Sequence, residues 1–377
     1  MDVKKKIKKE KIVIVGGFPS KNNKNFGGIV TSCKALTNSS FSQKYEIIPI
    51  DSTQISNPIP SIFIRIILAM RRTINFFIKV IIFRPKAVIL FTAIKTSILE
   101  KGLMAWIAYF LNTPVLMFPR GGIIIDEVKA SRFNKFWIKI AFGGASKILC
   151  QGPLWQRFAK NELGFKDNDL PIVYNWTATD NLIKLGKKRL MRVHKEPLRV
   201  LYLGWIEESK GVFDLLNVSQ EIMNEGNDFL LSFVGGGKDD QALKNLSKQN
   251  KMNKNVNFYG WLNHDDLENV FYESDILVLP SWVEGFPNSV IEGMASGLAI
   301  IATKVGNIPD IINDNIEAIL IPPKNRNKLK ESIFYLLKNE KIRYKIARQG
   351  HQFAIENFST EIAAKKLDII IREVISR

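Results

Sequence analysis

The sequence predicts an α/β protein made of two Rossmann-like domains, each built on a mainly parallel β-sheet. Short aliphatic runs of strand length alternate with helical segments along the whole chain, which is the pattern of parallel sheets. The chain has 377 residues, more than one ordinary hydrophobic core supports. A polar, lysine-rich stretch over residues 179–196 separates two sets of strands, and we interpret it as a linker.

The composition indicates a globular protein without a metal or disulfide framework. Hydrophobic residues make up 46% of the chain and charged residues 24%, as in ordinary folded domains. The two cysteines, Cys33 and Cys150, are too few and too far apart for a zinc site or a disulfide framework, which predicts a cytoplasmic location. The Asp-Asn-Asp triplet at residues 167–169 lies among loop-forming residues, so we interpret it as a turn. No metal ligands are predicted.

The excess positive charge lies in the first half of the chain. Residues 1–190 contain 31 lysines and arginines against 11 aspartates and glutamates, whereas residues 191–377 contain 23 against 25. A basic half of this kind can serve nucleic acid, anionic lipid or an anionic substrate. No nucleic-acid-binding module of recognised pattern occurs. We expect the basic half to dock on an anionic membrane surface, the attraction of an anionic soluble acceptor stays open as the competing interpretation, and no nucleic acid is expected.

One segment of the basic half combines charge with strong hydrophobicity. Residues 62–83 predict one or two helices in which bulky apolar side chains accompany Arg65, Arg71, Arg72 and Lys79. These charges leave no uncharged run long enough for a transmembrane helix, and no secretory signal is recognised. Two interpretations remain open: a helix on a membrane surface, or a helix packed on its domain with a solvated basic edge.

The first half contains six predicted strands, with a glycine loop after the first of them. The strands are residues 11–15, 47–50, 87–91, 114–118, 147–151 and 172–174. The loop runs from Gly16 to Gly28, and a helix over residues 29–37 follows it. Strand, glycine loop and helix indicate a phosphate-facing turn, but the glycines lack the spacing of the dinucleotide-binding fingerprint.

The second half repeats the alternation of strands and helices. Its predicted strands are residues 198–203, 229–234, 256–259, 276–279, 298–302 and 318–321. Helices are predicted to follow the first of these strands, over residues 211–225, and to close the chain from about residue 328 to its end.

The stretch 276–306 predicts a compact unit of strand, turn, helix and strand. Its first apolar run, 276–279, suits a strand buried on both faces. The turn 284–287 ends this strand, and a helix over 288–296 precedes the second strand, 298–302. Ligands of open α/β sheets bind beyond the carboxyl ends of such strands, so this turn is a candidate site.

Two carboxylates carry the chemistry of this stretch. Glu284 lies in the turn, and Glu292 lies about one turn inside the helix. Free backbone N–H groups at a helix start favour phosphate, and a carboxylate nearby accepts hydrogen bonds from sugar hydroxyls. This combination suits a sugar nucleotide. The same two residues are also explained as a loop charge and a solvated helix residue.

The surrounding residues show a family resemblance. The run E-G-F-P-N-S-V-I-E-G-M-A-S-G-L, residues 284–298, resembles the E-x7-E motif of the family 4 retaining glycosyltransferases, which have the GT-B fold. Further matching segments occur in the same order, at Tyr202-Leu203-Gly204, Lys210-Gly211, Phe233-Val234-Gly235-Gly236-Gly237, Val256-Asn257-Phe258-Tyr259-Gly260 and Asp275. The resemblance is close from about residue 198 to residue 323 and looser towards the N-terminus.

The resemblance implies a domain plan and a set of site residues. Residues 1–180 would bind the acceptor, residues 195–360 the nucleotide sugar across a central cleft, and a helix over 361–377 would cross back to the first domain. Glu284 would hold sugar hydroxyls and Glu292 the ribose. The rest of the implied binding set is Lys210, Gly285 and Phe286 at the diphosphate, Pro287 and Asn288 at the helix start, and Gly27 and Gly28 in the first domain.

The implied catalytic residues are Glu284, Lys210 and Arg120, and the chain departs from the family near two of them. Trp205 occupies the place of an arginine that partners the family's lysine. It either stacks or fills volume. Where many relatives have a histidine, this chain has Arg120, and no histidine occurs in residues 1–190. Because arginine does not deprotonate in proteins, Arg120 would stabilise charge, anchor the acceptor or support the structure.

The resemblance implies transfer of a sugar from a UDP- or GDP-linked donor to an acceptor hydroxyl, with retention and without a cofactor. The expected setting is synthesis of an envelope polysaccharide, lipopolysaccharide or glycolipid, on a lipid-linked or polysaccharide acceptor, at the inner face of the cell membrane. Two alternatives stay open. One is a sugar-nucleotide epimerase or hydrolase of similar fold, and the other is a non-enzymatic binding subunit, an alternative that the departures at Trp205 and Arg120 leave open.

Overall fold

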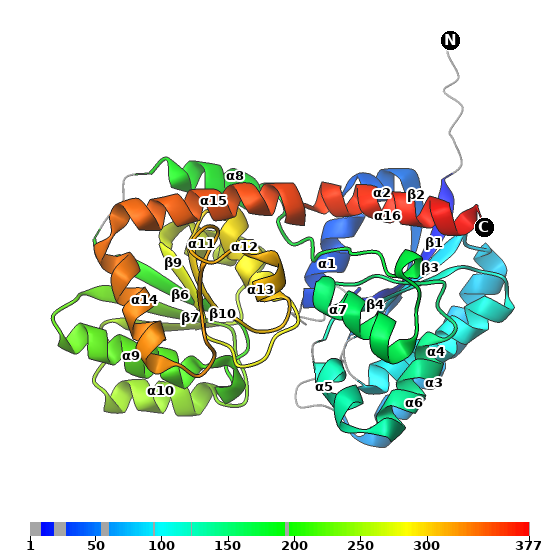
Figure 1. The fold of residues 1–377 in the computed structure, drawn as a ribbon, viewed down its shortest axis with the longest axis horizontal. Helices are drawn as coiled ribbons and strands as arrows, with labels where there is room; N and C mark the ends of the chain where they lie inside the picture. Colours follow the sequence, from blue (N-terminus) through cyan, green and yellow to red (C-terminus); the bar gives the residue numbers. More distant parts are fainter. Residues whose placement is uncertain are drawn as a thin grey trace, which may run out of the picture. The chain divides into compact units, whose positions relative to one another are not determined.

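The chain forms two compact units (Figure 1). The computed structural model describes residues 9–18, 28–53, 60–92, 95–121, 123–192 and 196–376. Unit 1 comprises residues 1–175 together with 360–377, and unit 2 comprises residues 176–359. Among the residues described, no helix is long and apolar enough to cross a membrane.

Unit 1 is built on a five-stranded parallel sheet with the strand order β2-β1-β3-β4-β5. The strands are β1 (Glu10–Gly16), β2 (Tyr45–Asp51), β3 (Ala87–Thr92), β4 (Val115–Pro119) and β5 (Lys147–Ile148). Every residue of β3 and β4 is buried, which explains their unbroken apolar sequences. The sixth predicted strand, 172–174, is wrong, because only Ile172 forms a bridge, to Cys150, before the chain leaves the sheet.

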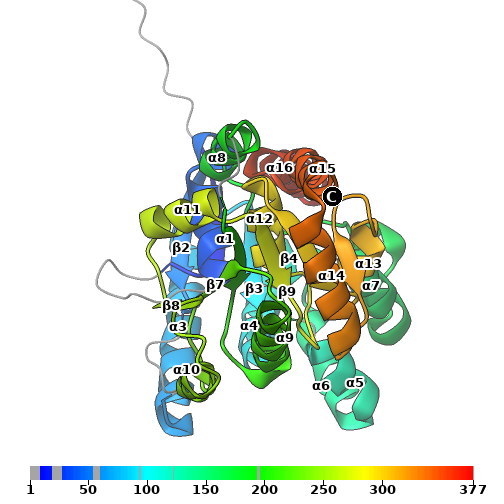
Figure 2. The ribbon, with the colours of Figure 1, turned by 90° about the vertical axis from the view of Figure 1, so that its left-hand side faces the viewer.

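Helices cover both faces of this sheet (Figures 1 and 2). In chain order they are α1 (Gly28–Thr37), α2 (Ser40–Lys44), α3 (Ile62–Phe83), α4 (Lys95–Phe110), α5 (Ile123–Ala130), α6 (Arg132–Phe142), α7 (Pro153–Phe158) and α16 (Thr360–Ile375). The π-helical turn Ala159–Leu163 follows α7, and the predicted turn at Asp167–Asp169 is a 3-10 helix. Helix α4 packs between α3 and α6 in one layer.

The last helix, α16, returns to unit 1 as predicted. It packs against α1, α2 and β3. Glu361 accepts a hydrogen bond from the backbone N–H of Ser40 (3.0 Å), and Asp368 accepts one from the hydroxyl of Tyr45 (2.6 Å). The polar contacts therefore join residues more than 300 positions apart in the sequence.

Unit 2 is built on a six-stranded parallel sheet with the order β11-β10-β9-β6-β7-β8. Its strands are β6 (Leu198–Leu203), β7 (Phe229–Val234), β8 (Val256–Gly260), β9 (Ile276–Leu279), β10 (Ala299–Thr303) and β11 (Ile319–Ile321). Its helices are α8 (Asp180–Leu190), α9 (Val212–Asn224), α10 (Asp240–Gln249), α11 (His264–Glu273), α12 (Asn288–Ala295), α13 (Ile308–Ile311), α14 (Arg326–Lys338) and α15 (Glu340–Phe358), with a 3-10 turn at Glu208–Lys210. The predicted strand-turn-helix-strand unit over 276–306 is confirmed as β9, α12 and β10.

The stretch 179–196 is not the linker that its composition suggested, because it contains helix α8. The side chain of Thr179 caps this helix by accepting a hydrogen bond from the N–H of Leu182. The helix packs against α11, α12 and α15 of unit 2. Its buried positions include Gly186 and Arg189. Neither is a bulky apolar residue, so the sequence does not show the periodic apolar pattern of a packed helix.

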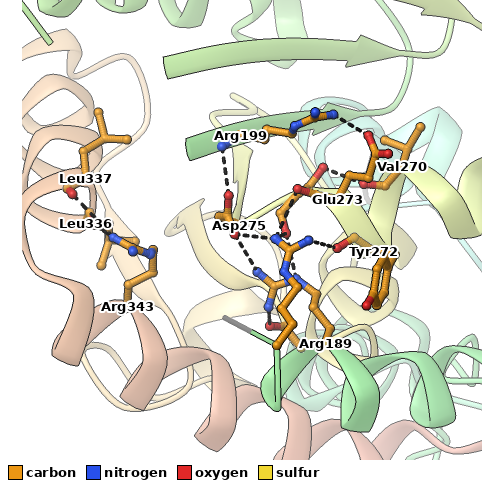
Figure 3. Close-up of polar contacts among 12 residues, drawn as sticks. Arg189, Arg199, Val270, Tyr272, Glu273, Asp275, Leu336, Leu337 and Arg343 are labelled. Carbon is orange, nitrogen blue, oxygen red and sulfur yellow. Dashed lines mark hydrogen bonds and ion pairs between the residues drawn. The ribbon is translucent and has the colours of Figure 1, made fainter. Parts of the chain in front are cut away.

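Arg189 belongs to a buried ion cluster at the amino end of β9 (Figure 3). The carboxylate of Asp275 accepts hydrogen bonds from Arg192 (2.7 Å) and from the backbone N–H of Arg199 (2.9 Å), and it pairs with Arg189 at 3.4 Å. Arg189 also donates to the carbonyl oxygens of Ser274 (2.7 Å) and Gly297. This cluster fixes α8 to the sheet, on the edge opposite to the carboxyl ends of the strands.

Candidate functional site

The candidate site of unit 2 lies where the strand order of its sheet reverses. Strands β6 and β9 are neighbours in the sheet although β7 and β8 separate them in sequence. Open α/β sheets bind ligands at such a switch point, beyond the carboxyl ends of the strands. Lys210 lies in the loop after β6 and Glu284 in the loop after β9.

Lys210 and Glu284 form an ion pair. The Nζ atom of Lys210 lies 2.7 Å from a carboxylate oxygen of Glu284, and it also donates to the carbonyl oxygen of Val283 at 3.3 Å. Their side chains are 22% and 14% exposed, so the pair is largely but not fully withdrawn from water. The structure thus brings together two of the three predicted catalytic residues.

Close backbone packing holds these two loops against each other. Gly211, which follows Lys210, has a φ of 69°, and a Cβ there would collide with the carbonyl group of Pro280. The N–H of Trp282 donates to the carbonyl oxygen of Ser209 at 2.8 Å. A side chain at position 211 would push the loops apart, so glycine is required for the ion pair to form.

A third loop, after β10, supports the turn that carries Glu284. The N–H of Asn307 donates to the carbonyl oxygen of Gly285 at 2.8 Å. Gly306 has a φ of 59°, and a Cβ there would collide with the carbonyl oxygens of Glu284 and Gly285. Sequence reasoning did not identify Gly306 as part of the site, since only the folded loop shows the close approach.

The remaining residues that were predicted to bind the nucleotide sugar lie at the start of α12. Pro287 is the N-cap of the helix and Asn288 its first residue. The ring of Phe286 is buried against that of Phe358, with 5.2 Å between their centroids. The ring therefore anchors the loop, and any contact of Phe286 with a diphosphate would be made by its backbone.

The carboxyl group of Glu292, in the second turn of α12, is largely withdrawn from water, although the residue as a whole is only partly buried. Burial raises its pKa to about 8, and Thr177 opposes this shift only in part. At neutral pH the carboxyl is therefore mostly protonated when no ligand is present. A ligand hydroxyl that donates a hydrogen bond to this group would favour its ionised form.

The raised pKa of Glu292 gives the protein a pH-dependent stability. The unfolded chain ionises this group near its ordinary pKa of 4.5, whereas the folded protein holds the proton up to about pH 8. The free energy of unfolding should therefore fall as pH rises through this window. The variant Glu292→Gln has no carboxyl group that must hold a proton in the folded state. We therefore expect its free energy of unfolding to exceed that of the wild type by about 3 kcal/mol at pH 7 and by less than about 1 kcal/mol at pH 5.

Urea unfolding of the full chain at pH 5, 7 and 9 checks this expectation. The matched control is Glu356→Gln, which changes an exposed carboxylate on α15 and should leave stability within about 0.5 kcal/mol at each pH. A stability difference for Glu292→Gln that is the same at pH 5 and pH 9 would contradict the buried, protonated state.

Two tryptophans lie beside the glycine-rich loop that follows β7. Trp205 is 41% exposed, so it does not fill the interior. Its ring lies edge-on to that of Trp261, with 4.9 Å between centroids. The N–H of Ile206 donates to the carbonyl oxygen of Gly236 at 3.0 Å, which holds the two loops together. Trp261 follows the V-N-F-Y-G segment directly, a position that sequence reasoning did not single out.

Arg120 lies at the carboxyl end of β4 in unit 1. It donates to the hydroxyl of Ser32 at 3.0 Å, and its guanidinium lies 5.0 Å from the ring centroid of Phe118 and 6.0 Å from that of Phe91. Burial lowers its pKa to about 10. The group is still a cation at neutral pH, which agrees with its exclusion as a general base.

The glycine loop of unit 1 is described only at its two ends. Gly27 lies outside the described residues, and Gly28 is the first residue of α1. The close approach at this end of β1 is made by Gly17, where a Cβ would lie 2.7 Å from the backbone of Val30. The predicted part of Gly28 in substrate binding stays a prediction.

Sequence comparisons relate the chain to glycosyltransferases. Residues 187–353 match the family model for glycosyl transferases group 1. An uncharacterized glycosyltransferase of Methanocaldococcus jannaschii is 28% identical over 62% of this chain, and the match spans 61% of that protein. The N,N'-diacetylbacillosaminyl-diphospho-undecaprenol alpha-1,3-N-acetylgalactosaminyltransferase of Campylobacter jejuni is 28% identical over 67% of this chain and 69% of its own length.

Solved structures show the fold. Sucrose-phosphate synthase from Thermosynechococcus elongatus superposes with a TM-score of 0.76 at 15% identity, covering 98% of this chain and 100% of the other. HepE of Anabaena in complex with UDP-glucose superposes with a TM-score of 0.69 at 14% identity, covering 97% and 99%. The predicted fold class, a GT-B protein with two parallel-sheet Rossmann-like units and a returning C-terminal helix, is confirmed.

Proposed function

We propose that the protein is a retaining glycosyltransferase of family 4 that moves a sugar from a nucleotide-linked donor to an acceptor hydroxyl. The observation that carries the proposal is the Lys210–Glu284 ion pair at the switch point of the unit 2 sheet. Both residues lie in the segment that matches glycosyl transferases group 1. An ammonium beside a carboxylate, at an edge that binds ligands, offers one group for a phosphate and one for sugar hydroxyls.

Each residue has a role in the transfer. The bond between the anomeric carbon and the diphosphate oxygen breaks while the acceptor oxygen bonds to the same carbon. Lys210 stabilises the negative charge that grows on the departing diphosphate, and Glu284 accepts hydrogen bonds from the sugar hydroxyls. Glu292 accepts hydrogen bonds from the ribose. The acceptor proton passes to the leaving phosphate, because Arg120 stays a cation and takes no proton.

We propose a UDP- or GDP-linked donor and no metal. Among the residues that the structure describes, no group of three histidine, cysteine, aspartate or glutamate side chains could hold a metal ion. HepE, which shares the fold, has been crystallised with UDP-glucose. In this proposal Lys210 and the N–H groups at the start of α12 supply the charge stabilisation that a metal would otherwise give.

We further propose a lipid-linked or polysaccharide acceptor at the inner face of an anionic membrane. The name of the Campylobacter relative describes transfer to a diphospho-undecaprenol acceptor, and the amylovoran biosynthesis glycosyltransferase of Erwinia amylovora is 23% identical over 48% of this chain. The basic residues of the first half favour attachment to anionic lipid.

Donor binding tests the assignment of Glu292. We expect Glu292→Ala to weaken binding of the sugar nucleotide by about 1.5–3 kcal/mol, because a charge-assisted hydrogen-bond acceptor is lost. Affinity of the wild type should also rise between pH 6 and pH 8, since the ligand favours the ionised carboxylate. Calorimetry with a panel of UDP- and GDP-sugars measures both effects.

The variant Glu292→Gln, which keeps the shape of the side chain, provides the control for pH. Its affinity should not change between pH 6 and pH 8. If Glu292→Ala binds UDP and GDP compounds as tightly as the wild type, Glu292 is not the ribose ligand. Donor hydrolysis without transfer to any acceptor would instead favour the hydrolase alternative, and failure to bind any sugar nucleotide would favour the binding subunit.

A further inference from the structure

Helix α3 has the reverse of the amphipathic pattern of a water-soluble helix. Its exposed apolar side chains include a stripe at helical spacing, formed by Phe63, Ile67, Met70, Ile74, Phe77 and Ile81. Phe63 is 75% exposed and Ile74 60%. Only Phe76 and Val80 of this helix are buried. Surface helices of globular proteins normally turn their apolar side to the core and their charges to water.

Three of the four basic residues of α3 contact their own domain, whereas Arg71 is exposed. Arg72 forms two hydrogen bonds with Glu100 of α4, the shorter at 2.7 Å, and Arg65 donates to the hydroxyl of Thr96 at 3.0 Å. Lys79 donates to the carbonyl oxygen of Pro49 at 2.8 Å. These three residues, seven positions apart, lie on the inward flank. That these basic residues contact a membrane directly stays a prediction, and so does the alternative that they form a solvated basic edge of a packed helix.

The two neighbouring helices extend the apolar surface. On α4 the exposed apolar side chains are Leu99, Leu103, Tyr109 and Phe110, and on α6 they are Phe133, Phe136, Trp137 and Ile140. Helices α3, α4 and α6 lie side by side (Figures 1 and 2). The indole N–H of Trp106 donates to the carbonyl oxygen of Ile140 at 2.9 Å, which ties α4 to α6. We call the exposed side chains of these three helices the apolar face.

The charge around the apolar face has one sign. The three helices together contain one carboxylate, Glu100, and it is paired with Arg72 and Lys101. Exposed basic residues accompany the face, namely Arg71 on α3 and Arg132 and Lys139 on α6. Their long side chains can keep the charge at a lipid headgroup while the apolar side chains enter the acyl layer.

We propose that the apolar face inserts into the interface of an anionic bilayer, with α3 lying along the membrane surface. An exposed apolar area of this extent marks an interaction surface, and the absence of any unpaired carboxylate among its described residues selects anionic lipid as the partner. A protein bound to vesicles by charge alone would be released by salt, whereas a protein whose apolar face is inserted would stay partly bound. The inference deepens the proposed function at the membrane and rests on that part of it.

An environment-sensitive fluorophore tests insertion directly. The native thiols of Cys33 and Cys150 are buried, and burial raises the pKa of both to about 12, so an introduced exposed cysteine can be labelled selectively. We label Ile74→Cys on the apolar face and, as the control, Ile316→Cys, an exposed isoleucine of unit 2, each with NBD. The probe at position 74 should shift to the blue and brighten with phosphatidylcholine vesicles that contain phosphatidylglycerol. The probe at position 316 should not change.

Co-sedimentation with the same vesicles measures the energetic contribution. The double variant Ile67→Gln, Ile74→Gln should bind at least about tenfold more weakly. Arg71→Gln with Arg132→Gln and Lys139→Gln should reduce the preference for anionic over neutral vesicles. The matched control, Ile316→Gln, should bind as the wild type does.

Three results would overturn the proposal. They are a position-74 probe that stays in an aqueous environment with anionic vesicles, a double glutamine variant that sediments like the wild type, and a probe shift without vesicles that grows with protein concentration. The last result would assign the apolar face to a second copy of the chain. Because these assays contain neither donor nor acceptor, their outcome is independent of whether the protein transfers a sugar.

Discussion

Replacement of Lys210 by alanine is expected to lower kcat about 100-fold while weakening donor binding less than about tenfold. The leaving diphosphate gains negative charge in the transition state, so the ammonium contributes most there. In the unliganded protein Lys210 is already neutralised by Glu284 at 2.7 Å. Its contact with the ground-state donor is therefore gained partly at the cost of this ion pair, which limits its contribution to affinity.

Steady-state kinetics and calorimetry on the same preparations separate the two effects. Lys210→Met, which keeps most of the aliphatic side chain, should behave like Lys210→Ala if charge is what matters. The control is Lys328→Ala, which removes an exposed lysine that pairs with Glu331 at 2.6 Å on α14. It should leave kcat and affinity unchanged. Equal losses of affinity and kcat in Lys210→Ala would show that Lys210 binds donor and transition state alike.

The largest expected loss of stability follows from replacing Asp275 by alanine. This carboxylate is 2% exposed, and it is the partner of Arg189, which is equally buried (Figure 3). Removing one member of a buried ion pair leaves the other charge uncompensated, which costs about 3–5 kcal/mol. We therefore expect the free energy of unfolding of unit 2 to fall by this amount in Asp275→Ala.

A nearby exposed ion pair supplies the control. Glu273 pairs with Arg199, and their side chains are 55% and 38% exposed. Glu273→Ala should cost less than about 1 kcal/mol. The double variant Asp275→Ala, Arg189→Met should lose less than the sum of the single variants, because the buried guanidinium of Arg189 is no longer left without its carboxylate. Urea unfolding of the full chain measures all four, and a loss in Asp275→Ala no larger than that in Glu273→Ala would contradict the buried-pair account.

The sequence predicts secondary structure best where its apolar pattern matches the burial of the element in the fold. Strands β9 and β10 and the helix between them follow closely from short aliphatic runs and the turn residues between them. Helix α3 has the bounds expected from the sequence, Ile62–Phe83. Apolar side chains occur all around this helix, however, so periodicity could not show which of its faces is exposed. Its packing against the sheet and α4 decides that.

Helix α8 escaped prediction because its buried face is not apolar. Its buried positions are Leu182, Gly186 and Arg189, spaced as on one helical face. Gly186 is required there because a Cβ would collide with Ala295 and His351. Arg189 is buried only because Asp275, 86 residues away, neutralises it. A helix whose buried face depends on distant partners has the composition of a linker.

The candidate site was predictable in its residues but not in its contacts. Glu284 and Lys210 were recognised from motifs, yet their pairing joins positions 74 apart. The supporting role of Gly306 and the neighbouring position of Trp261 depend on loops that meet only in the folded unit. The raised pKa of Glu292 comes from desolvation, which a sequence pattern does not report.

The most direct test of the central claim is release of nucleoside diphosphate from a panel of UDP- and GDP-sugars in the presence of acceptor and EDTA. The wild type should release diphosphate with at least one donor, form a glycosylated product of retained anomeric configuration, and keep its rate in EDTA. Lys210→Ala should lose about 99% of that rate. A product of inverted configuration, a rate abolished by EDTA and restored by magnesium or manganese, or a fully active Lys210→Ala would contradict the account.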